Sequence, residues 1–470
     1  MLNSETKKRL VIQDIKEKYI NISRPWVIGY SGGKDSTCVL ELVWQALSEL
    51  RDDERKDKIF VVTSDTMVES PLVSEYISDM MFLLDKAANE QKLPISVHCV
   101  KPETKDTFWV NLIGRGYPAP RTKFRWCTDR LKIEPANRLI LDLVSRFGEA
   151  VVVLGVRKSE SSARAQVIRR RQSNANIAAG AELPRHSTLP GAYVYAPISD
   201  WSTDEVWEYL LLNAATPWNS NNRDLAAMYK EASDGECPLV IDNSTASCGN
   251  SRFGCWVCTV VEKNKSLENI ADKGREWLEP LIRYRNMLMD TTEPSNKAKY
   301  REYKRRSGNV SIAKNDLTGE TKIIRGPYYF HWRKHFLNEL LKAEREIINK
   351  TNKEYSLITP QELKEIRKLW ITEEGDWEDS VPLIYRGVFG HDLPWDIDDS
   401  SRFGAADMEL LQRICSEINI SPELVSRLID KEREFSAAGR RSSLNKELDI
   451  ILREEWRTEQ EILENESILK

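Results

Sequence analysis

The sequence lacks the features of a membrane-embedded or secreted protein. No apolar run in the 470 residues reaches the roughly 20 residues that a membrane-spanning helix needs. The segment Met1–Tyr19 is charged and has no apolar signal-peptide core. These absences predict a cytoplasmic protein. The sequence also has no internal repeat and no low-complexity tract, and its length predicts two or three domains with a large core.

A strong charge of either sign is absent as well. The chain has 69 Lys and Arg residues against 73 Asp and Glu residues, a formal net charge of −4. This balance gives no indication of a nucleic-acid-binding protein. A local basic patch could still bind DNA, because the binding free energy depends on where the cations lie.

Cysteines are few, and their expected compartment excludes a disulfide framework. The chain has eight of them, and in a reducing compartment a cluster of cysteines indicates metal or sulfur chemistry. Cys38, Cys99 and Cys415 lie in apolar strand or helix patterns, so we expect them in the core.

The most informative segment is the hexapeptide Ser31–Ser36, with the sequence Ser-Gly-Gly-Lys-Asp-Ser. It follows the apolar run Trp26–Tyr30 and precedes the helical pattern of Cys38–Leu50. A strand, a glycine turn and a helix start present backbone N–H groups and a helix dipole to an anion. The Walker A spacing of glycines is absent. The hexapeptide instead resembles the PP-loop of ATP pyrophosphatases, which cut ATP between the α and β phosphates and activate a substrate by adenylation.

Each residue type in the hexapeptide suits phosphate chemistry. The backbone amides of Gly32 and Gly33 can approach a phosphate because no Cβ is in the way. Lys34 offers a point charge, and the serines at the two ends, Ser31 and Ser36, offer hydroxyls. We expect Asp35 to help bind Mg²⁺ rather than to act as a base, because the leaving pyrophosphate carries the charge that needs neutralising.

Strands and helices alternate over residues 1–235, which predicts a doubly wound, mostly parallel α/β sheet with ligands at the carboxyl ends of its strands. Helical patterns include Pro71–Lys92 and Glu134–Phe147, and Ser202 with Glu205 forms a capping box. The predicted strands are short, apolar and β-branched: Trp26–Tyr30, Lys58–Thr63, Ile95–Val100, Ala150–Gly155 and Tyr193–Ile198.

Residues that follow two of these strands are further candidates for the nucleotide site. Gly155, Arg157 and Arg164 follow one strand, and the two arginines could clamp a phosphate. Asp65 follows another strand, and a helix N-cap or turn residue is the alternative interpretation of it. Residues 157–192 are expected to form a long active-site loop.

Cys127 lies in a basic segment, Arg121–Arg130. Four nearby cations would lower the pKa of its thiol and favour a reactive or sulfur-carrying thiolate. A buried small residue is the alternative interpretation.

Four further cysteines gather in the pattern C-x10-C-x6-C-x2-C, which predicts a shared metal. Zinc and iron–sulfur clusters both accept four thiolates, so the spacing leaves both open, including a zinc site that only staples the fold. These metal ligands are Cys237, Cys248, Cys255 and Cys258.

The PP-loop, the Gly-x-Arg segment, the basic segment around Cys127 and the four-cysteine spacing together resemble the DndC family. These are the sulfurtransferases of DNA phosphorothioation, PAPS reductase-like proteins with SspD as a close relative. The resemblance covers roughly residues 10–330 and implies ATP pyrophosphatase activity, a [4Fe–4S] cluster on the four cysteines, and sulfur replacing a non-bridging oxygen of a DNA phosphate. It places Asp65 beside the nucleotide. It implies a cysteine desulfurase as sulfur source and complexes with a DndD-like ATPase and a DndE-like DNA-binding protein.

We therefore expect three domains: a PP-loop domain at 1–235, an iron–sulfur and aromatic-basic region at 236–335, and a helical region at 336–470. The expected catalytic residues are Lys34, Asp35, Cys127 and Arg157, with Mg²⁺ and ATP as cofactors.

Two other functions stay open. One is an adenylyl- or phosphoadenylyl-sulfate reductase, and the other is a non-catalytic, zinc-stapled DNA-binding scaffold. The stretches Tyr300–Arg306 and Tyr328–Lys334 fit either DNA binding or helix packing.

Overall fold

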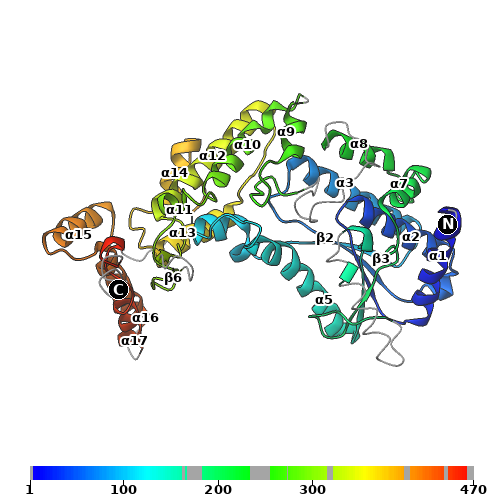
Figure 1. Ribbon diagram of the computed structural model, residues 1–470, viewed down its shortest axis with the longest axis horizontal. Helices are drawn as coiled ribbons and strands as arrows, with labels where there is room; N and C mark the ends of the chain where they lie inside the picture. The colour runs from blue at the N-terminus through cyan, green and yellow to red at the C-terminus, as the bar shows by residue number, and fades with distance from the viewer. Residues whose placement is uncertain are drawn as a thin grey trace. The chain divides into compact units, whose positions relative to one another are not determined.

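Five parallel strands form the central sheet in the computed structural model, which describes residues 4–160, 165–166, 183–232, 254–272, 274–314, 321–395, 403–438 and 443–462. The strand order is β3-β2-β1-β4-β5. Figure 1 labels two of these strands, β2 and β3. The predicted doubly wound α/β fold is confirmed, and all five predicted strands are present. Their bounds are β1 Trp26–Gly29, β2 Ile59–Ser64, β3 Ile95–Val100, β4 Ala150–Val153 and β5 Ala192–Tyr195.

The order of the strands places the site. The chain runs outward from β1 to β3 and then returns to add β4 on the other side of β1. Ligands of open α/β sheets bind at such a reversal, outside the carboxyl ends of the two strands. Here these are the ends of β1 and β4, where the PP-loop and Gly155 follow.

Helices cover both faces of the sheet, because successive strand residues point to opposite sides. Ile28 packs into the core under the helices α1, α2, α3 and α7, whereas Val27 packs into the core under α5. The capping box at the start of α7 is confirmed, with the Glu205 N–H donating to Ser202 Oγ at 3.1 Å. The helices are α1 Ser4–Asn21, α2 Lys34–Ser48, α3 Pro71–Glu90, α4 Trp126–Thr128, α5 Glu134–Phe147, α7 Thr203–Leu212, α8 Asn222–Ala232 and α9 Lys265–Asp272.

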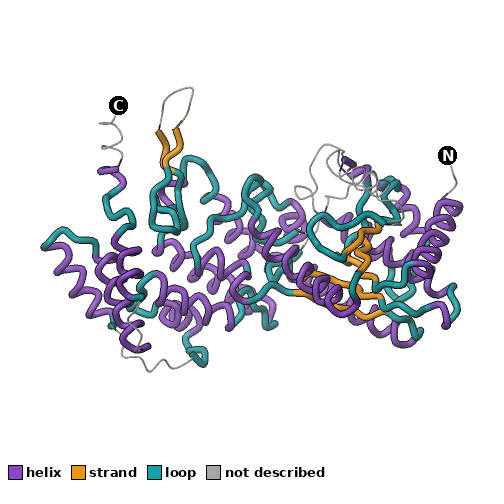
Figure 2. Tube along the Cα trace, turned by 90° about the horizontal axis from the view of Figure 1, so that it is seen from below, coloured by secondary structure: helices purple, strands orange, loops and turns teal. Residues whose placement is uncertain are grey.

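The chain forms two compact units, residues 1–103 with 120–282 and residues 104–119 with 283–470. The three predicted domains, with boundaries at 235 and 335, stay a prediction. The second unit is mainly helical and has one antiparallel hairpin (Figure 2). The remaining elements are α10 Glu279–Asp290, α11 Lys297–Tyr300, β6 Ile312–Lys314, β7 Thr321–Ile323, α12 Phe330–Thr351, α13 Pro360–Glu373, α14 Ser380–Phe389, α15 Ala405–Glu417, α16 Pro422–Ala438 and α17 Leu444–Leu452.

The aromatic-basic stretch Tyr328–Lys334 contributes two residues to the packing of the second unit. Tyr328 and Arg333 are fully buried. The Arg333 guanidinium donates to the carbonyl oxygens of Ile113 and Gly114 at 2.9 and 2.6 Å, and it pairs with Glu374 at 2.7 Å. For these two residues the packing interpretation is confirmed.

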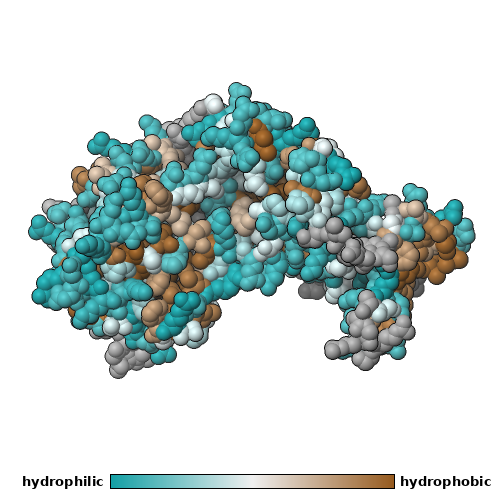
Figure 3. Space-filling model, turned by 180° about the vertical axis from the view of Figure 1, so that it is seen from behind, coloured by the Kyte–Doolittle hydropathy of each residue, from teal (hydrophilic) through white to brown (hydrophobic). Residues whose placement is uncertain are grey.

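The end of α15 leaves apolar side chains exposed. Leu410, Ile414 and Ile418 recur at intervals of four residues, and between 45% and 58% of each is exposed. Figure 3 shows the hydrophobic patch at its right-hand side, over α15. The stripe is too short for a bilayer, and no helix in the described ranges has the length and apolar character to cross a membrane.

Candidate functional site

The hexapeptide forms the predicted turn between a strand and a helix. Gly32 has φ of 68°, a left-handed conformation that favours glycine, and Gly33 is the N-cap of α2. The Ser31 N–H donates to Ser36 Oγ at 3.2 Å, and the Ser36 hydroxyl donates to the Gly33 carbonyl at 2.9 Å. These bonds brace the loop and leave it at the N-terminus of a helix of 15 residues.

Gly155 brings the end of β4 against this loop. A Cβ at position 155 would lie 2.8 Å from the carbonyl oxygen of Asp35 and 3.0 Å from the nitrogen of Ser36. Any side chain there would push the first turn of α2 away. Glycine is thus required at position 155, because the backbone of Asp35 and Ser36 approaches it closely where the strand order reverses.

Arg157 and Lys34 hold the carboxylate of Asp35 between them. The Arg157 Nε–H donates to Asp35 Oδ1 at 2.7 Å, and Lys34 Nζ lies 3.0 Å from Asp35 Oδ2. Arg157 is 2% exposed, and its Nη1 also donates to Ser159 Oγ and Thr203 Oγ1, both at 3.0 Å. Three of the four predicted catalytic residues therefore meet at one point. The Arg157 fork points at Asp35, and its use as a phosphate clamp stays a prediction.

Tyr229, on α8, is a member of this site that the sequence did not indicate. The Lys34 N–H donates to the Tyr229 hydroxyl at 3.3 Å. The Lys34 ammonium lies 5.8 Å from the centroid of the same ring. Because 195 residues separate the two positions, no local pattern could have paired them.

Asp65 lies in the turn after β2. Its Oδ1 accepts the N–H of Met67 at 2.8 Å, and its Oδ2 pairs with Lys101 at 2.9 Å. The alternative interpretation, a turn residue, is confirmed, and contact with a nucleotide stays a prediction. Arg164 lies outside the described residues.

Cys255 and Cys258 lie on a short segment that runs against the loop after β2. Cys255 forms an isolated antiparallel bridge with Glu69. Its sulfur is 3.5 Å from the Thr66 hydroxyl. The Cys258 N–H donates to the Cys255 carbonyl at 3.1 Å, which is the tight turn of a C-x-x-C segment. Burial raises the pKa of the Cys255 thiol.

Cys127 joins these two cysteines. The Thr259 hydroxyl donates to the Pro120 carbonyl at 2.5 Å and ties the two chain segments together. The pKa of Cys127 is raised to about 12, first by burial and then by Cys255 and Cys258. The expectation of a lowered pKa is wrong, because the basic neighbours Arg121 and Lys123 point into solvent and the groups facing the thiol are other thiols.

We call Cys127, Cys255 and Cys258 the three-thiol group. Cys237 and Cys248 lie outside the described residues. Within the described ranges no three metal-binding side chains stand close enough to hold an ion in this conformation. The donors themselves fit zinc or iron, because both metals are ligated by thiolates. To bind one metal ion together, the three thiols would have to move closer to one another and lose their protons.

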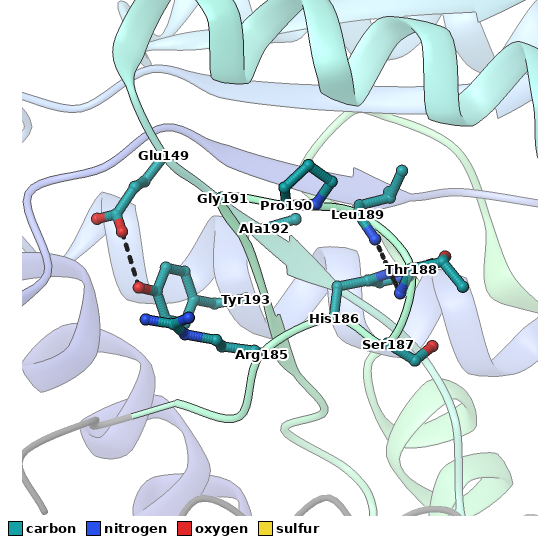
Figure 4. A pocket seen from close by; sticks show the side chains of 10 residues that line it. All are labelled: Glu149, Arg185, His186, Ser187, Thr188, Leu189, Pro190, Gly191, Ala192 and Tyr193. Atoms are coloured by element: carbon teal, nitrogen blue, oxygen red, sulfur yellow. Dashed lines mark hydrogen bonds between the residues drawn. The ribbon is translucent and has the colours of Figure 1, made fainter. Parts of the chain in front are cut away.

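A separate pocket of about 520 Å³ lies at the opposite ends of β4 and β5 (Figure 4). Glu149 and residues 185–193 line it, and the Tyr193 hydroxyl donates to the Glu149 carboxylate at 2.7 Å. His186 Nδ1 accepts the N–H of Leu189 at 3.2 Å. The amino ends of the strands are far from the PP-loop in the topology, so this pocket belongs to no part of the nucleotide site.

Comparison with known proteins gives the family. The phosphoadenosine phosphosulfate reductase domain family matches residues 25–261, half of the chain. The chain belongs to this family. The matched range includes the PP-loop, Gly155, Arg157 and the three-thiol group. A second family, described as a small protein found in certain Dnd DNA modification systems, matches residues 406–452.

Relatives of this PAPS reductase-like chain are distant. An uncharacterized protein of Methanocaldococcus jannaschii is 26% identical over 289 residues, which cover 62% of this chain and 46% of the relative. The chain thus spans about half the length of that relative. Among solved structures, the phosphoadenylyl-sulfate reductase of Candida auris, as a phosphate complex, is 16% identical with a TM-score of 0.30 and covers 49% of this chain and 94% of its own. The U34-tRNA thiolase NcsA of Methanococcus maripaludis, with its [4Fe–4S] cluster, is 13% identical with a TM-score of 0.27 and covers 61% and 81%.

Proposed function

We propose that this chain is an ATP pyrophosphatase and sulfurtransferase of DNA phosphorothioation. It binds Mg·ATP at Ser31–Ser36, adenylates a phosphate of the DNA backbone and helps to replace a non-bridging oxygen with sulfur. The convergence of Lys34, Asp35 and Arg157 on the PP-loop carries the proposal. The match of residues 406–452 to a small protein of Dnd systems supports the choice of DNA as substrate.

The chemistry follows from the leaving groups. A phosphate oxygen of the DNA attacks the α phosphorus of ATP and pyrophosphate leaves, with its charge neutralised by Mg²⁺ and by Lys34. The transferred oxygen can then leave as part of AMP when a sulfur nucleophile attacks the DNA phosphorus. A persulfide on Cys127 can be that nucleophile, provided a second thiol reduces the remaining S–S bond. A cysteine desulfurase supplies the sulfur, and DndD-like and DndE-like proteins complete the assembly.

The thiols that would hold a [4Fe–4S] cluster are Cys255 and Cys258, with further ligands from Cys237, Cys248 or Cys127. When bound, the cluster supplies a site for sulfide. Replacing Cys127 by Ser separates its two candidate roles. If Cys127 carries a persulfide, the variant keeps its iron and its ATP cleavage but forms no phosphorothioate. If Cys127 is a ligand, the variant loses iron. Unchanged phosphorothioate formation would remove Cys127 from both roles.

Two assays test the proposal against its alternatives. Release of pyrophosphate from ATP by the purified protein, stimulated by DNA, is the expected result, and its absence would favour the scaffold. Sulfite formation from adenylyl sulfate would favour the reductase. The visible absorption of anaerobically purified protein separates iron from zinc, because Zn²⁺ has no visible bands.

A further inference from the structure

The Tyr229 hydroxyl lies where the PP-loop would bind a phosphate oxygen. The first N–H groups of a helix have no partner within the helix, and at a phosphate-binding loop they face the anion. Lys34 is the first residue of α2, and its N–H donates to Tyr229. The same hydroxyl is 3.3 Å from the position that a Cβ on Gly33 would take, so it lies directly over the second glycine of the loop.

Tyr229 also lies against the charge that a phosphate would need. The Lys34 ammonium is 5.8 Å from the ring centroid, within the range of a cation–π contact. Both donors of Lys34, the backbone N–H and the ammonium, therefore face the same aromatic side chain. A triphosphate that uses these donors must replace Tyr229 at the backbone N–H.

Two contacts hold the helix α8. Asn222 anchors its start, and the contact between Tyr229 and Lys34 holds its end. At the start, Asn222 Nδ2 donates to the Glu41 carboxylate of α2 at 2.6 Å. Near the end, the Tyr229 ring packs edge-to-face on Trp207 at 5.1 Å and meets the PP-loop. A displacement of Tyr229 from the loop would remove the contact that holds this end of α8.

We propose that Tyr229 is a positioning residue that competes with nucleotide for the PP-loop. Before nucleotide binds, its hydroxyl takes the place of a phosphate oxygen at the Lys34 N–H. Nucleotide displaces the hydroxyl and releases the last turn of α8. This inference rests on the proposed binding of ATP at Ser31–Ser36.

The test compares Tyr229→Phe with the wild-type chain in calorimetric titrations with Mg²⁺ and α,β-methylene ATP, which cannot be cleaved between the α and β phosphates. Phenylalanine keeps the ring and removes the competing oxygen. The variant should bind the analogue about 2- to 10-fold more tightly, the worth of one neutral hydrogen bond. Tyr195→Phe is the matched control, because Tyr195 is buried in the same core and its hydroxyl bonds Asp14 away from the loop. Its affinity should equal that of the wild type.

Equal or weaker binding by Tyr229→Phe overturns the inference, and weaker binding would mean that the hydroxyl donates to the bound phosphate. No binding by either chain, with circular dichroism showing both folded, overturns the proposed function as well. Hydrogen exchange on the wild-type chain gives a test that needs no variant. The analogue should speed exchange in the last turn of α8, near Tyr229, and unchanged or slower exchange there overturns the release of that turn.

Discussion

The PP-loop and the three-thiol group lie in the same unit and differ in what completes them. At the PP-loop, Lys34 and Arg157 lie 3.0 and 2.7 Å from the Asp35 carboxylate, so these three side chains leave one net positive charge at the loop. At the three-thiol group, the thiols of Cys127 and Cys255 have raised pKa values and no opposing cation outweighs burial. The fold itself orders the phosphate site, whereas the thiol site needs a ligand that drives off protons.

The largest expected effect comes from Lys34→Met at the PP-loop. Loss of the ammonium that faces the phosphates should lower the rate of ATP cleavage about 100- to 1,000-fold, as for other pre-organised donors to a developing anion. Bound iron, measured on the same preparation, should not change. Lys158→Met is the control, because Lys158 pairs with Asp200 at 2.7 Å instead of with the loop. Loss of iron in Lys34→Met would show that the PP-loop and the three-thiol group do not act independently.

Cys255→Ser tests the other region. A serine oxygen is a poor ligand for iron, so the variant should lose most of its bound iron and its visible absorption. ATP cleavage should stay within about 3-fold of the wild type, since distant sites act nearly independently. Cys99→Ser is the control and should keep its iron, because Cys99 is exposed on β3 and not in the core as its apolar strand pattern predicted. Iron content that survives in Cys255→Ser would show that Cys255 is not a ligand.

Gly155→Ala should weaken the PP-loop by a smaller amount. The added Cβ would lie 2.8 Å from the Asp35 carbonyl, and overpacking of this kind costs about 1–3 kcal/mol. Urea unfolding should show that loss in the N-terminal unit, and calorimetry should show weaker nucleotide binding. Gly387→Ala, in α14, meets nothing within 4 Å and should be stabilising or neutral. Wild-type affinity in Gly155→Ala would mean that the loop can move without cost.

The last prediction concerns the pH dependence of stability and Glu41, a buried residue of α2. Burial raises its pKa from 4.5 to about 8, although Asn222 and Tyr209 hydrogen-bond to it. The folded state binds this proton more tightly than the unfolded state. The stabilisation is therefore complete below about pH 4.5 and is lost as the pH rises towards 8, by at most about 1.4 kcal/mol per pH unit.

Glu41→Gln keeps the shape without the charge, so its melting temperature should fall less than that of the wild type between pH 5 and 8. Glu90→Gln, at the exposed end of α3, should follow the wild-type profile. Identical profiles for Glu41→Gln and the wild type would show that Glu41 does not govern this pH dependence.

Local patterns predicted the sheet well. Each strand is a short apolar run between turn residues, and the tight turn of the PP-loop requires the positive φ that Gly32 adopts. Gly155 was predicted to lie at the nucleotide site, because ligands of such sheets bind at the carboxyl ends of the strands. These inferences needed only neighbours along the chain and one rule of topology.

Long-range contacts were beyond the sequence. The direction of the Arg157 fork depends on Asp35, 122 residues away, and Tyr229 reaches Lys34 from a separate helix. The basic residues around Cys127 suggested a thiolate. Two of them, Arg121 and Lys123, are exposed to solvent, and a sequence does not state where a side chain points. After burial, the groups that raise the pKa of Cys127 most are the thiols of Cys255 and Cys258, from another segment of the chain.

The pairing of β1 with β4 has a consequence for synthesis of the chain. Trp26 pairs with Val151, so β1 lacks one of its neighbours until a further 125 residues have been made. At translation rates of about 5–20 residues per second, the central strand of the nascent chain keeps an open edge for roughly 10 s. Over that interval the growing polypeptide can pair with the wrong strand, and a chaperone bound to this edge would protect the yield of folded protein.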